Sequence, residues 1–368
     1  MTRAKKVLAT LGAVLVAGIA ALALYVSHDS PCPATVALPA GTQSMQAVVY
    51  RCYGSPRVMN VEQIARPTPA DDRVLVRVHA ASVNPLDWHY VEGKPYIMRP
   101  MAGFGAPHDI RLGVDFAGTV EAVGRKVTRF KPGDEVFGGA DGSFAQYVTP
   151  RAEGSMALKP ANMSFEQAAA VPIAAVTALQ ALRNQGQLHS GQKVLINGAS
   201  GGVGTFAVQI AKHLGGQVTA VCSTRNLALV QSIGADHVID YTHEDFTRGA
   251  EHYDLIIDTV GSHSLGDYRR VLTPTGTLVI VGGPSDGVWL GPMSGALKAM
   301  VVARFVHQKL VFMLAELNKD DLELLGTWME SGQLTPVIDR RYPLAQTREA
   351  LAYLLQGHAR GKVVINVE

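Results

Sequence analysis

A glycine-rich turn is the part of this sequence whose residue types and spacing most clearly indicate chemistry. Residues 193–197 are a short apolar run typical of a buried strand, and residues 205–214 have the apolar spacing of a helix. The turn between them contains glycine at positions 198, 201, 202 and 204. Glycines let the backbone approach phosphate groups, and a helix N-terminus offers unpaired N–H groups and a positive dipole end. We therefore expect a dinucleotide pyrophosphate to bind at Ser200, Gly201, Gly202 and Val203.

The end of the next strand distinguishes between the two nicotinamide dinucleotides. A strand over residues 217–222 follows the helix, and NAD sites usually carry Asp or Glu at this strand's end to bind the ribose 2′-hydroxyl. Here the strand is followed by Ser223, Thr224 and Arg225. Two hydroxyls and a guanidinium suit a 2′-phosphate, which a carboxylate would repel. The sequence thus predicts NADPH in preference to NADH; the alternative is that Arg225 is only a solvated residue at a helix start.

The elements around the turn predict an open α/β sheet. Strand and helix patterns alternate between residues 171 and 315, with strands at 193–197, 218–222, 237–239, 254–258 and 277–281. This alternation indicates βαβ units and a parallel, doubly wound sheet. Residues 45–170 contain short alternating strands broken by Gly and Pro, which predicts a barrel-like β domain. The tail has strands near 335–342 and 362–367 on either side of a helix at 346–356.

Length and composition agree with a two-domain globular protein. The chain has 368 residues, nearly half of them hydrophobic, and a formal net charge of +2. This charge provides no basic field for nucleic acid. The three cysteines, Cys32, Cys52 and Cys222, have neither the spacing of a disulfide framework nor that of a metal site. We expect Cys222, at a strand end, to be a small buried hydrophobe.

The glycine turn also carries a family resemblance. Residues 191–212 resemble the quinone oxidoreductase and zeta-crystallin signature of the medium-chain dehydrogenase/reductase superfamily. Further segments resemble motifs of this family and occur in the same order along the chain: 45–50, 74–78, 82–87, 113–118, 130–136 and 234–241. The resemblance covers roughly residues 45–368 and implies a GroES-like substrate domain at 45–170, completed by 316–368, and a Rossmann NADP-binding domain at 171–315. It also implies a homodimer.

The resemblance further implies an enzyme without a metal. Alcohol dehydrogenases of this superfamily hold a catalytic zinc with a Cys in the active-site turn and a Gly-His-Glu at the next turn. This chain has Asn84 at the first place and Gly113-Val114-Asp115 at the second. A valine cannot coordinate zinc, and an amide is a poor ligand beside thiolate or imidazole. Zinc-free relatives reduce quinones or α,β-unsaturated carbonyls with NADPH, so we expect a small-molecule carbonyl or quinone substrate.

By their position in the motif, Asn84 and Asp87 resemble residues that line the nicotinamide pocket of these relatives. Asn84 would orient the carboxamide or a substrate oxygen. Asp87 would position a water or hold the turn, and its alternative role is an Asx-type cap. Tyr96 lies near the place where some relatives carry a substrate-contacting tyrosine, which makes it a candidate proton donor.

The resemblance also implies cofactor contacts at several individual residues. Thr177 matches a helix threonine beside the nicotinamide, and Tyr241 lies on the side of the adenine and the 2′-phosphate. Val260 and Gly282 follow the fourth and fifth strands, at the carboxyl ends where open α/β sheets bind ligands. Lys362 is a possible contact, and its alternative role is simply to begin a strand.

The N-terminus adds a hydrophobic segment that the resemblance does not cover. Residues 7–26 contain no charge and are long enough to cross a bilayer as a helix. Arg3, Lys5 and Lys6 precede this run, and no Lys or Arg follows it before Arg51. The positive-inside rule then places the enzyme outside the cytosol, in conflict with a cytosolic supply of NADPH. We expect a membrane anchor at residues 1–44, with the side of the membrane left open; a cleaved signal peptide and a true start at Met45, with a cytoplasmic enzyme, are the alternatives.

Two functions remain open at this point. The first is a metal-free reductase that transfers hydride from NADPH to a quinone or an α,β-unsaturated carbonyl. The second is a catalytically silent NADPH-binding protein, such as a crystallin or a sensor. Substrate identity depends on loops such as 94–111 and 284–300, whose shape the sequence does not determine.

Overall fold

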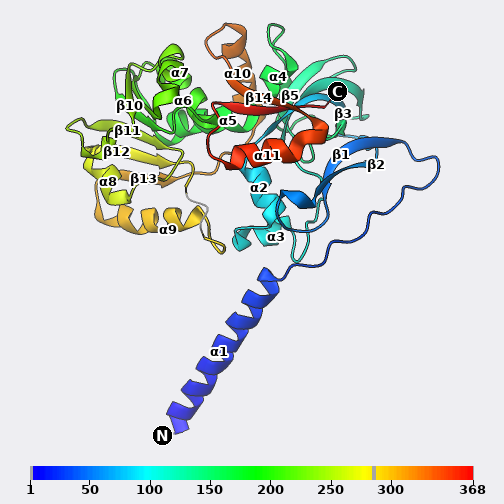
Figure 1. Ribbon diagram of the computed structural model, residues 1–368, viewed down its shortest axis with the longest axis horizontal. Helices are drawn as coiled ribbons and strands as arrows, with labels where there is room; N and C mark the ends of the chain where they lie inside the picture. The colour runs from blue at the N-terminus through cyan, green and yellow to red at the C-terminus, as the bar shows by residue number, and fades with distance from the viewer. Residues whose placement is uncertain (1–2, 284–286, 368) are drawn as a thin grey trace.

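The computed structural model describes residues 3–283 and 287–367; residues 284–286, at the start of the segment 284–300 that we expect to influence substrate choice, lie outside this range. The described chain forms an α/β half, a β half and a long N-terminal helix that extends away from both (Figure 1). The α/β half is built on a sheet of six strands in the order β10-β9-β8-β11-β12-β13. All five pairings in this sheet are parallel. This is the order of a doubly wound dinucleotide-binding sheet, and it confirms the predicted fold class.

Four strands of the parallel sheet lie within one residue of the predicted ranges, whereas the strand at 272–280 begins five residues before its predicted start and the strand at 309–312 was not predicted. The six strands are β8 (Lys193–Asn197), β9 (Gln217–Cys222), β10 (His237–Asp240), β11 (Tyr253–Asp258), β12 (Leu272–Ile280) and β13 (Lys309–Phe312). Successive residues on a strand point to opposite faces, and helices cover both faces here. Val194 and Ile196 therefore enter one hydrophobic core, with α5 (Pro172–Leu179) and α6 (Gly202–His213), while Leu195 enters the other. The second core also includes residues of α8 (Leu265–Arg270) and α9 (Met293–Val302).

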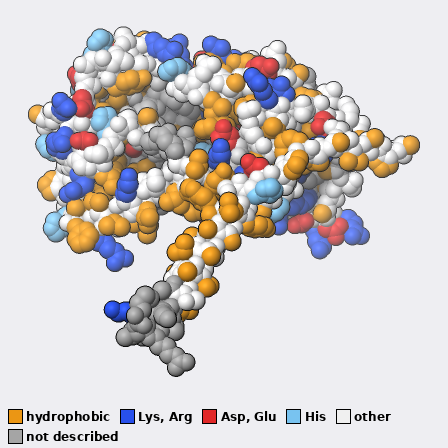
Figure 2. All heavy atoms as spheres, turned by 60° about the horizontal axis from the view of Figure 1, so that its bottom comes forward, with side chains coloured by type: hydrophobic (Ala, Val, Ile, Leu, Met, Phe, Trp, Pro, Cys, Tyr) orange, Lys and Arg blue, Asp and Glu red, His pale blue; other side chains and the backbone are white. Residues whose placement is uncertain are grey.

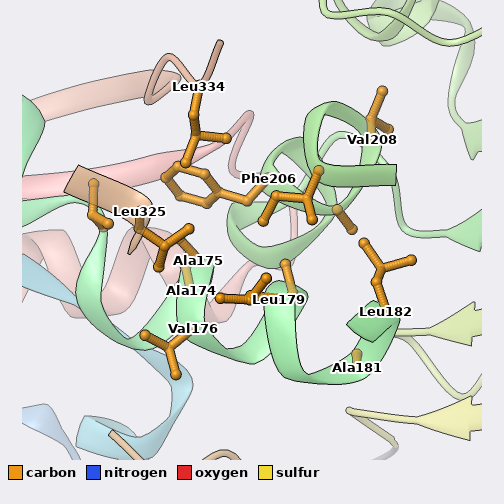
Figure 3. Packing of buried hydrophobic residues seen from close by; sticks show 14 of the residues in the cluster. Ala174, Ala175, Val176, Leu179, Ala181, Leu182, Phe206, Val208, Leu325 and Leu334 are labelled. Atoms are coloured by element: carbon orange, nitrogen blue, oxygen red, sulfur yellow. The ribbon is translucent and has the colours of Figure 1, made fainter. Parts of the chain in front are cut away.

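The larger core joins the two halves at α5 and α6. Ala174 and Ala175 on α5 are small enough to let α6 pack closely, and the ring of Phe206 fills the space between the two helices (Figure 3). Leu325, on α10 (Lys319–Glu330), and Leu334 close this core from the other side (Figure 3). The packing fixes the position of α6, whose N-terminus follows the glycine turn. The helix α7 (Leu227–Ser232) lies over β10 and completes the described helices of this half.

The β half is a mostly antiparallel sheet that the end of the chain completes. Its order is β14-β15-β3-β4-β5-β7, with β6 also paired to β3, and β1 and β2 form a separate hairpin pair. Its strands are β1 (Ser44–Tyr50), β2 (Met59–Ala65), β3 (Val74–Val83), β4 (Asp115–Val123), β5 (Glu135–Gly139), β6 (Tyr147–Val148), β7 (Met156–Leu158), β14 (Ile338–Pro343) and β15 (Lys362–Asn366). Its helices are α2 (Pro85–Glu92), α3 (Arg99–Ala102), α4 (Phe165–Ala169) and α11 (Thr347–Leu355). Because β15 pairs with β3, Lys362 lies beside the turn that follows β3.

The N-terminal segment forms the helix α1 (Arg3–Ser27). Its window Thr10–Ser27 has a mean hydropathy of 2.1 and is 0% buried, so it is long and apolar enough to span a membrane. The chain after α1 returns to the β half, where Cys32 forms a disulfide with Cys52. The spacing of the cysteines, which is not that of a disulfide framework, did not predict this pair, whereas Cys222 is buried and free as expected. The two paired cysteines meet because the fold brings their Cα atoms to 4.9 Å, and their spacing along the chain carries no sign of this contact.

Candidate active site

The glycine turn is built by close backbone approaches. Gly198 has a φ of +82°, and a Cβ at this position would lie 2.3 Å from Thr259 Oγ1. A Cβ on Gly204 would lie 2.1 Å from the carbonyl oxygen of Gly198, so only glycine lets the helix pack against the turn. The helix α6 begins at Gly202, with Gly201 as its N-cap, three residues before the predicted start at 205. Gly201, Gly202 and Val203 therefore form the N-terminal end of the helix, where backbone N–H groups have no partner within the helix.

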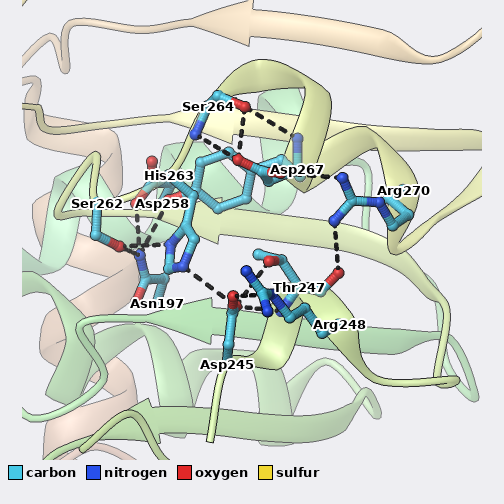
Figure 4. A network of polar contacts seen from close by, with 11 residues as sticks. Asn197, Asp245, Thr247, Arg248, Asp258, Ser262, His263, Ser264, Asp267 and Arg270 are labelled. Atoms are coloured by element: carbon cyan, nitrogen blue, oxygen red, sulfur yellow. Dashed lines mark hydrogen bonds and ion pairs between the residues drawn. The ribbon is translucent and has the colours of Figure 1, made fainter.

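A polar network holds the neighbouring strand ends in place (Figure 4). Asn197 Nδ2, at the end of β8, donates to Asp258 Oδ1 at 3.0 Å and to the hydroxyl of Tyr268 at 3.1 Å. The same carboxylate oxygen accepts the backbone N–H of Val260 at 3.1 Å. The backbone N–H of Gly282 donates to the carbonyl oxygen of Asp258 at 3.3 Å. Val260 and Gly282 thus lie together at the carboxyl edge of the sheet, as expected from their strands.

The turn before α2 is closed by Asn84 and Asp87. The backbone N–H of Asn84 donates to Asp87 Oδ2 at 2.7 Å, and Pro85 occupies the first helical position. Asp87 is 1% exposed, and this burial raises the pKa of its carboxyl group from 3.8 to about 7. The hydrogen bond from Asn84 opposes the rise, and the Asp115 carboxylate adds to it. Asp87 therefore makes the capping contact that was its alternative role in the sequence.

Asn84 belongs to a buried polar cluster that sequence reasoning only partly found. Its Nδ2 donates to Asp115 Oδ2 at 2.9 Å, and its Oδ1 accepts from Lys362 Nζ at 2.6 Å. Lys362 Nζ also lies 3.5 Å from Asp115 Oδ2, and Ser82 Oγ donates to that oxygen at 2.8 Å. All four residues are at most 4% exposed. Burial lowers the pKa of Lys362, while the Asp115 carboxylate opposes this fall.

This cluster, Ser82–Asn84–Asp115–Lys362, touches the glycine turn. The backbone N–H of Gly361 donates to the carbonyl oxygen of Ser200 at 2.9 Å. A Cβ on Gly202 would lie 3.2 Å from Lys362 Cδ. The cluster therefore lies between the helix end that would hold a pyrophosphate and the turn before α2. Lys362 is more than the first residue of a strand, because its ammonium group is bonded inside this junction.

Thr177 lies one helical turn from the same cluster. The other oxygen of Asp115, Oδ1, accepts the backbone N–H of Ile173 at the start of α5 at 3.0 Å. Thr177 Oγ1 donates to the carbonyl oxygen of Ile173 at 2.6 Å. Sequence reasoning missed Ser82 and Asp115. The only signal for Asp115 was its place at the third position of Gly113-Val114-Asp115.

A carboxylate that sequence reasoning did not consider lies beside the end of β9. Asp240 ends the neighbouring strand β10, and its Oδ2 accepts from Thr224 Oγ1 at 2.5 Å. Hydrogen bonds from hydroxyl groups, that of Thr224 first, lower the pKa of Asp240, so this side chain is charged at neutral pH. Arg225 Nη2 donates to the carbonyl oxygen of His358 at 2.7 Å. The neighbouring ends of β9 and β10 therefore present one cation, Arg225, and one anion, Asp240.

Hydrogen bonds connect the other predicted cofactor contacts at the strand-end edge of the parallel sheet. Asn226 Nδ2 donates to Ser200 Oγ at 2.9 Å and to Ser223 Oγ at 3.2 Å, which joins the glycine turn to the end of β9. Tyr241 is 56% exposed, and its backbone N–H donates to the carbonyl oxygen of Cys222 at 3.1 Å. Ser200, Ser223 and Tyr241 thus share the strand-end edge of the parallel sheet.

Tyr96 has a different set of contacts from Asn84 and Asp87. Its ring packs edge-on against Trp289, with centroids 5.0 Å apart, and the guanidinium of Arg99 lies 4.7 Å from its centroid. Its backbone N–H donates to the carbonyl oxygen of Val288 at 2.8 Å. Tyr96 therefore joins the segment after α2 to the segment that precedes α9. Among residues 3–283 and 287–367, no group of three His, Cys, Asp or Glu side chains is arranged to hold a metal ion.

Comparison with known proteins agrees with this geometry. Residues 70–160 match the family model of the alcohol dehydrogenase GroES-like domain, and residues 233–365 match that of the zinc-binding dehydrogenases. A 2-methylene-furan-3-one reductase from Solanum lycopersicum is 35% identical over 337 residues, which cover 88% of this chain and 79% of that protein. An NADPH-dependent alkenal/one oxidoreductase of Arabidopsis thaliana chloroplasts is 33% identical, covering 88% and 80% respectively.

A solved structure extends the likeness to three dimensions. The quinone oxidoreductase from Coxiella burnetii superposes with a TM-score of 0.77 at 31% identity, over 89% of this chain and 100% of that one. Fold, glycine turn and relatives agree: the chain belongs to the quinone oxidoreductase-like family of the medium-chain dehydrogenase/reductase superfamily and is a nicotinamide-dependent oxidoreductase.

Proposed function

We propose that this enzyme reduces quinones or α,β-unsaturated carbonyl compounds, without a metal and with NADPH as the source of hydride. The observation that carries the proposal is the buried Ser82–Asn84–Asp115–Lys362 cluster, which joins the glycine turn to the turn before α2. Reductases of an alkenal or enone and a quinone oxidoreductase among the relatives support the substrate class. Asn84 and Val114 stand at the positions that would carry zinc ligands, which supports chemistry without zinc.

The residues fit a dinucleotide. A Cβ on Gly201 would meet only the carbonyl oxygen of Gly198, at 3.4 Å, so the outer side of the turn is open to a phosphate. Gly201, Gly202 and Val203 would hold the pyrophosphate on the N-terminal end of α6. Thr177, Val260 and Gly282 would line the nicotinamide side, and Tyr241 the adenine side. When bound, the reduced nicotinamide supplies a hydride to the electron-poor carbon of the substrate.

The polar cluster gives the site its rigidity. The carboxamide of Asn84 is held from both ends, by Lys362 on its oxygen and by Asp115 on its nitrogen, so its orientation is set before any ligand binds. Asp87 holds the turn through the backbone N–H of Asn84. Burial raises the pKa of its carboxyl group to about 7. Tyr96, whose ring packs against Trp289 and Arg99, is the candidate for contact with the substrate.

The preference for NADPH depends on the balance between positive and negative charge at the neighbouring ends of β9 and β10. Ser223, Thr224 and Arg225 offer two hydroxyls and a guanidinium to a 2′-phosphate. Asp240 opposes this preference, because its charge lies within hydrogen-bond distance of Thr224. We propose that Arg225 outweighs Asp240, since Arg225 is exposed and its bond to the His358 carbonyl can be exchanged for one to the phosphate, whereas Asp240 is held by two threonine hydroxyls. Asp240→Asn should therefore increase the preference for NADPH further.

We also propose that α1 anchors the enzyme in a membrane. Its apolar window has no cover in the fold, and basic residues precede it. The Cys32–Cys52 disulfide and the positive-inside rule both favour a catalytic body outside the cytosol, against the cytosolic supply of NADPH. Protease protection of right-side-out and inverted vesicles tests the orientation. Full solubility of the intact protein, with Met45 as its N-terminus, would refute the anchor.

The experiment that tests the proposed reaction is NADPH consumption by the full chain in detergent, with a panel of quinones, enones and simple alcohols. We expect turnover of quinones or enones and little oxidation of alcohols. Absence of turnover with every member of the panel, together with tight binding of NADPH, would favour the catalytically silent alternative.

A further inference from the structure

The helix α9 and the 3-10 turn that follows it, Ala303–Phe305, expose an apolar stripe. The exposed fractions are 58% for Leu297, 66% for Met300, 56% for Val301 and 83% for Phe305. Leu297, Met300 and Val301 are three and four residues apart, so they share one face of α9, and Phe305 follows in the 3-10 turn. The opposite face packs on β13, where Ala299 is 1% exposed. The stripe is therefore the outer side of a helix whose inner side is already packed.

A second exposed apolar group extends this surface from the β half. Met101 is 80% exposed, Ile97 43% and Phe104 40%. This segment is joined to the one before α9, because the backbone N–H of Ile97 donates to the carbonyl oxygen of Trp289 at 3.1 Å. Trp289 is itself 45% exposed. Figure 2 shows hydrophobic side chains gathered on this face, around the base of α1.

The helix α1 leaves the protein at the same face. Arg99, which is 0% exposed, donates through Nη1 to the carbonyl oxygens of Val26 and His28, and through Nη2 to Asp29 Oδ1 at 2.6 Å. The ring of Tyr25 lies 5.2 Å from that of Phe104. With the Cys32–Cys52 disulfide, these contacts hold the end of the helix against the segment that carries Met101 and Phe104.

The charged residues along the apolar stripe are all basic. Between Met293 and Phe305 the charged residues are Lys298 and Arg304, both exposed, and the sequence there contains no Asp or Glu. An apolar stripe beside basic residues is the pattern of a helix that lies in the interface of an anionic bilayer. A bilayer crossed by α1 would necessarily lie close to this face, because the helix end is fixed to it.

We propose that this apolar face, formed by Ile97, Met101, Phe104, Trp289, Leu297, Met300, Val301 and Phe305, rests in the headgroup region of the bilayer that α1 crosses. The occupant of the face is a lipid surface, with Lys298 and Arg304 directed at anionic headgroups. The protein is then held by two attachments: one helix through the membrane, and one face on it. Orientation of the catalytic body relative to the membrane follows from the rigid contacts of Arg99.

The test uses the full chain in vesicles of phosphatidylcholine and phosphatidylglycerol with brominated acyl chains. Cys222 is buried and Cys32 and Cys52 are paired, so a single added cysteine can carry an environment-sensitive fluorophore. Phe305→Cys places it on the face. Gln231→Cys, on exposed α7 at the opposite side in Figure 1, is the matched control. Phe305 is 83% exposed, so the exchange removes little packing.

We expect severalfold stronger quenching by brominated lipid at position 305 than at 231, and a smaller difference when phosphatidylglycerol is omitted. Equal quenching at the two positions would overturn the proposal. A spectral shift at 305 that depends on protein concentration in detergent, and not on lipid, would also overturn it, since the face would then bind a second copy. Met300→Cys repeats the measurement on the same stripe and should agree with position 305. These readouts do not depend on the proposed reaction.

Discussion

Replacing Lys362 by methionine tests the role assigned to the buried cluster. Methionine keeps much of the side-chain volume and removes the ammonium group. The change leaves the carboxylate of Asp115, which is 0% exposed, without its cation, and removes the donor at 2.6 Å from Asn84 Oδ1. An uncompensated buried charge typically costs about 3–5 kcal/mol. We therefore expect Lys362→Met to lower the free energy of unfolding by about this amount.

The matched control is Lys193→Met. Lys193 also begins a strand, β8, but its side chain is 48% exposed and pairs with the exposed Glu251. Exposed ion pairs contribute about 0–1 kcal/mol, so this variant should stay within about 1 kcal/mol of wild type. Urea unfolding followed by tryptophan fluorescence measures both values. The double variant Lys362→Met/Asp115→Asn should recover much of the loss, because it leaves no unpaired charge.

Kinetics separate a positioning role from a purely structural one. If Lys362 orients the amide of Asn84, Lys362→Met should lower kcat at least roughly tenfold, the equivalent of about 1.4 kcal/mol, at temperatures where the variant is fully folded. The double variant should stay slow although its stability returns. A Lys362→Met enzyme as stable and as fast as wild type would refute the reasoning, and would reduce Lys362 to the first residue of a strand.

Three further outcomes follow from the site. Arg225→Ala should weaken NADPH binding about tenfold or more in a fluorescence titration and leave NADH nearly unchanged, since a charge-assisted bond contributes about 1.5–3 kcal/mol; equal losses for both cofactors would contradict the assignment. The pKa of Asp87 is raised by burial from 3.8 to about 7, so the native state binds its proton more tightly, and stability should fall by up to about 4 kcal/mol as pH rises from about 4 to about 7. Asp87→Asn should remove this pH dependence in urea unfolding; a slope that persists in the variant would assign it to another group. With Asn84 and Val114 at the ligand positions, chelators should leave activity intact, and stoichiometric zinc in elemental analysis of protein purified without a metal column would overturn the metal-free assignment.

Features with a local cause could be predicted from the sequence. The run 193–197 and the glycines after it have their strand, turn and helix because apolar patterning and the left-handed φ of Gly198 act over a few residues. Alternation of such units predicted the parallel sheet, and the strand ends predicted the edge where Ser200, Val260 and Gly282 lie. Even there the start of α6 was misjudged by three residues, because a helix N-terminus depends on backbone contacts that residue type does not show.

Contacts between distant segments were decided by the tertiary structure alone. Lys362 and Asn84 are 278 residues apart in the chain, and they meet only because β15 pairs with β3. Cys32 and Cys52 show the same limit, since neither spacing nor composition indicated their pairing. A buried charge is tolerated where the fold supplies its partner, and periodicity along one segment carries no information about a partner on another. The sequence by itself thus determined the glycine turn and the sheet that presents it, whereas the packing of chain ends against the middle determined the cluster that contains Asn84.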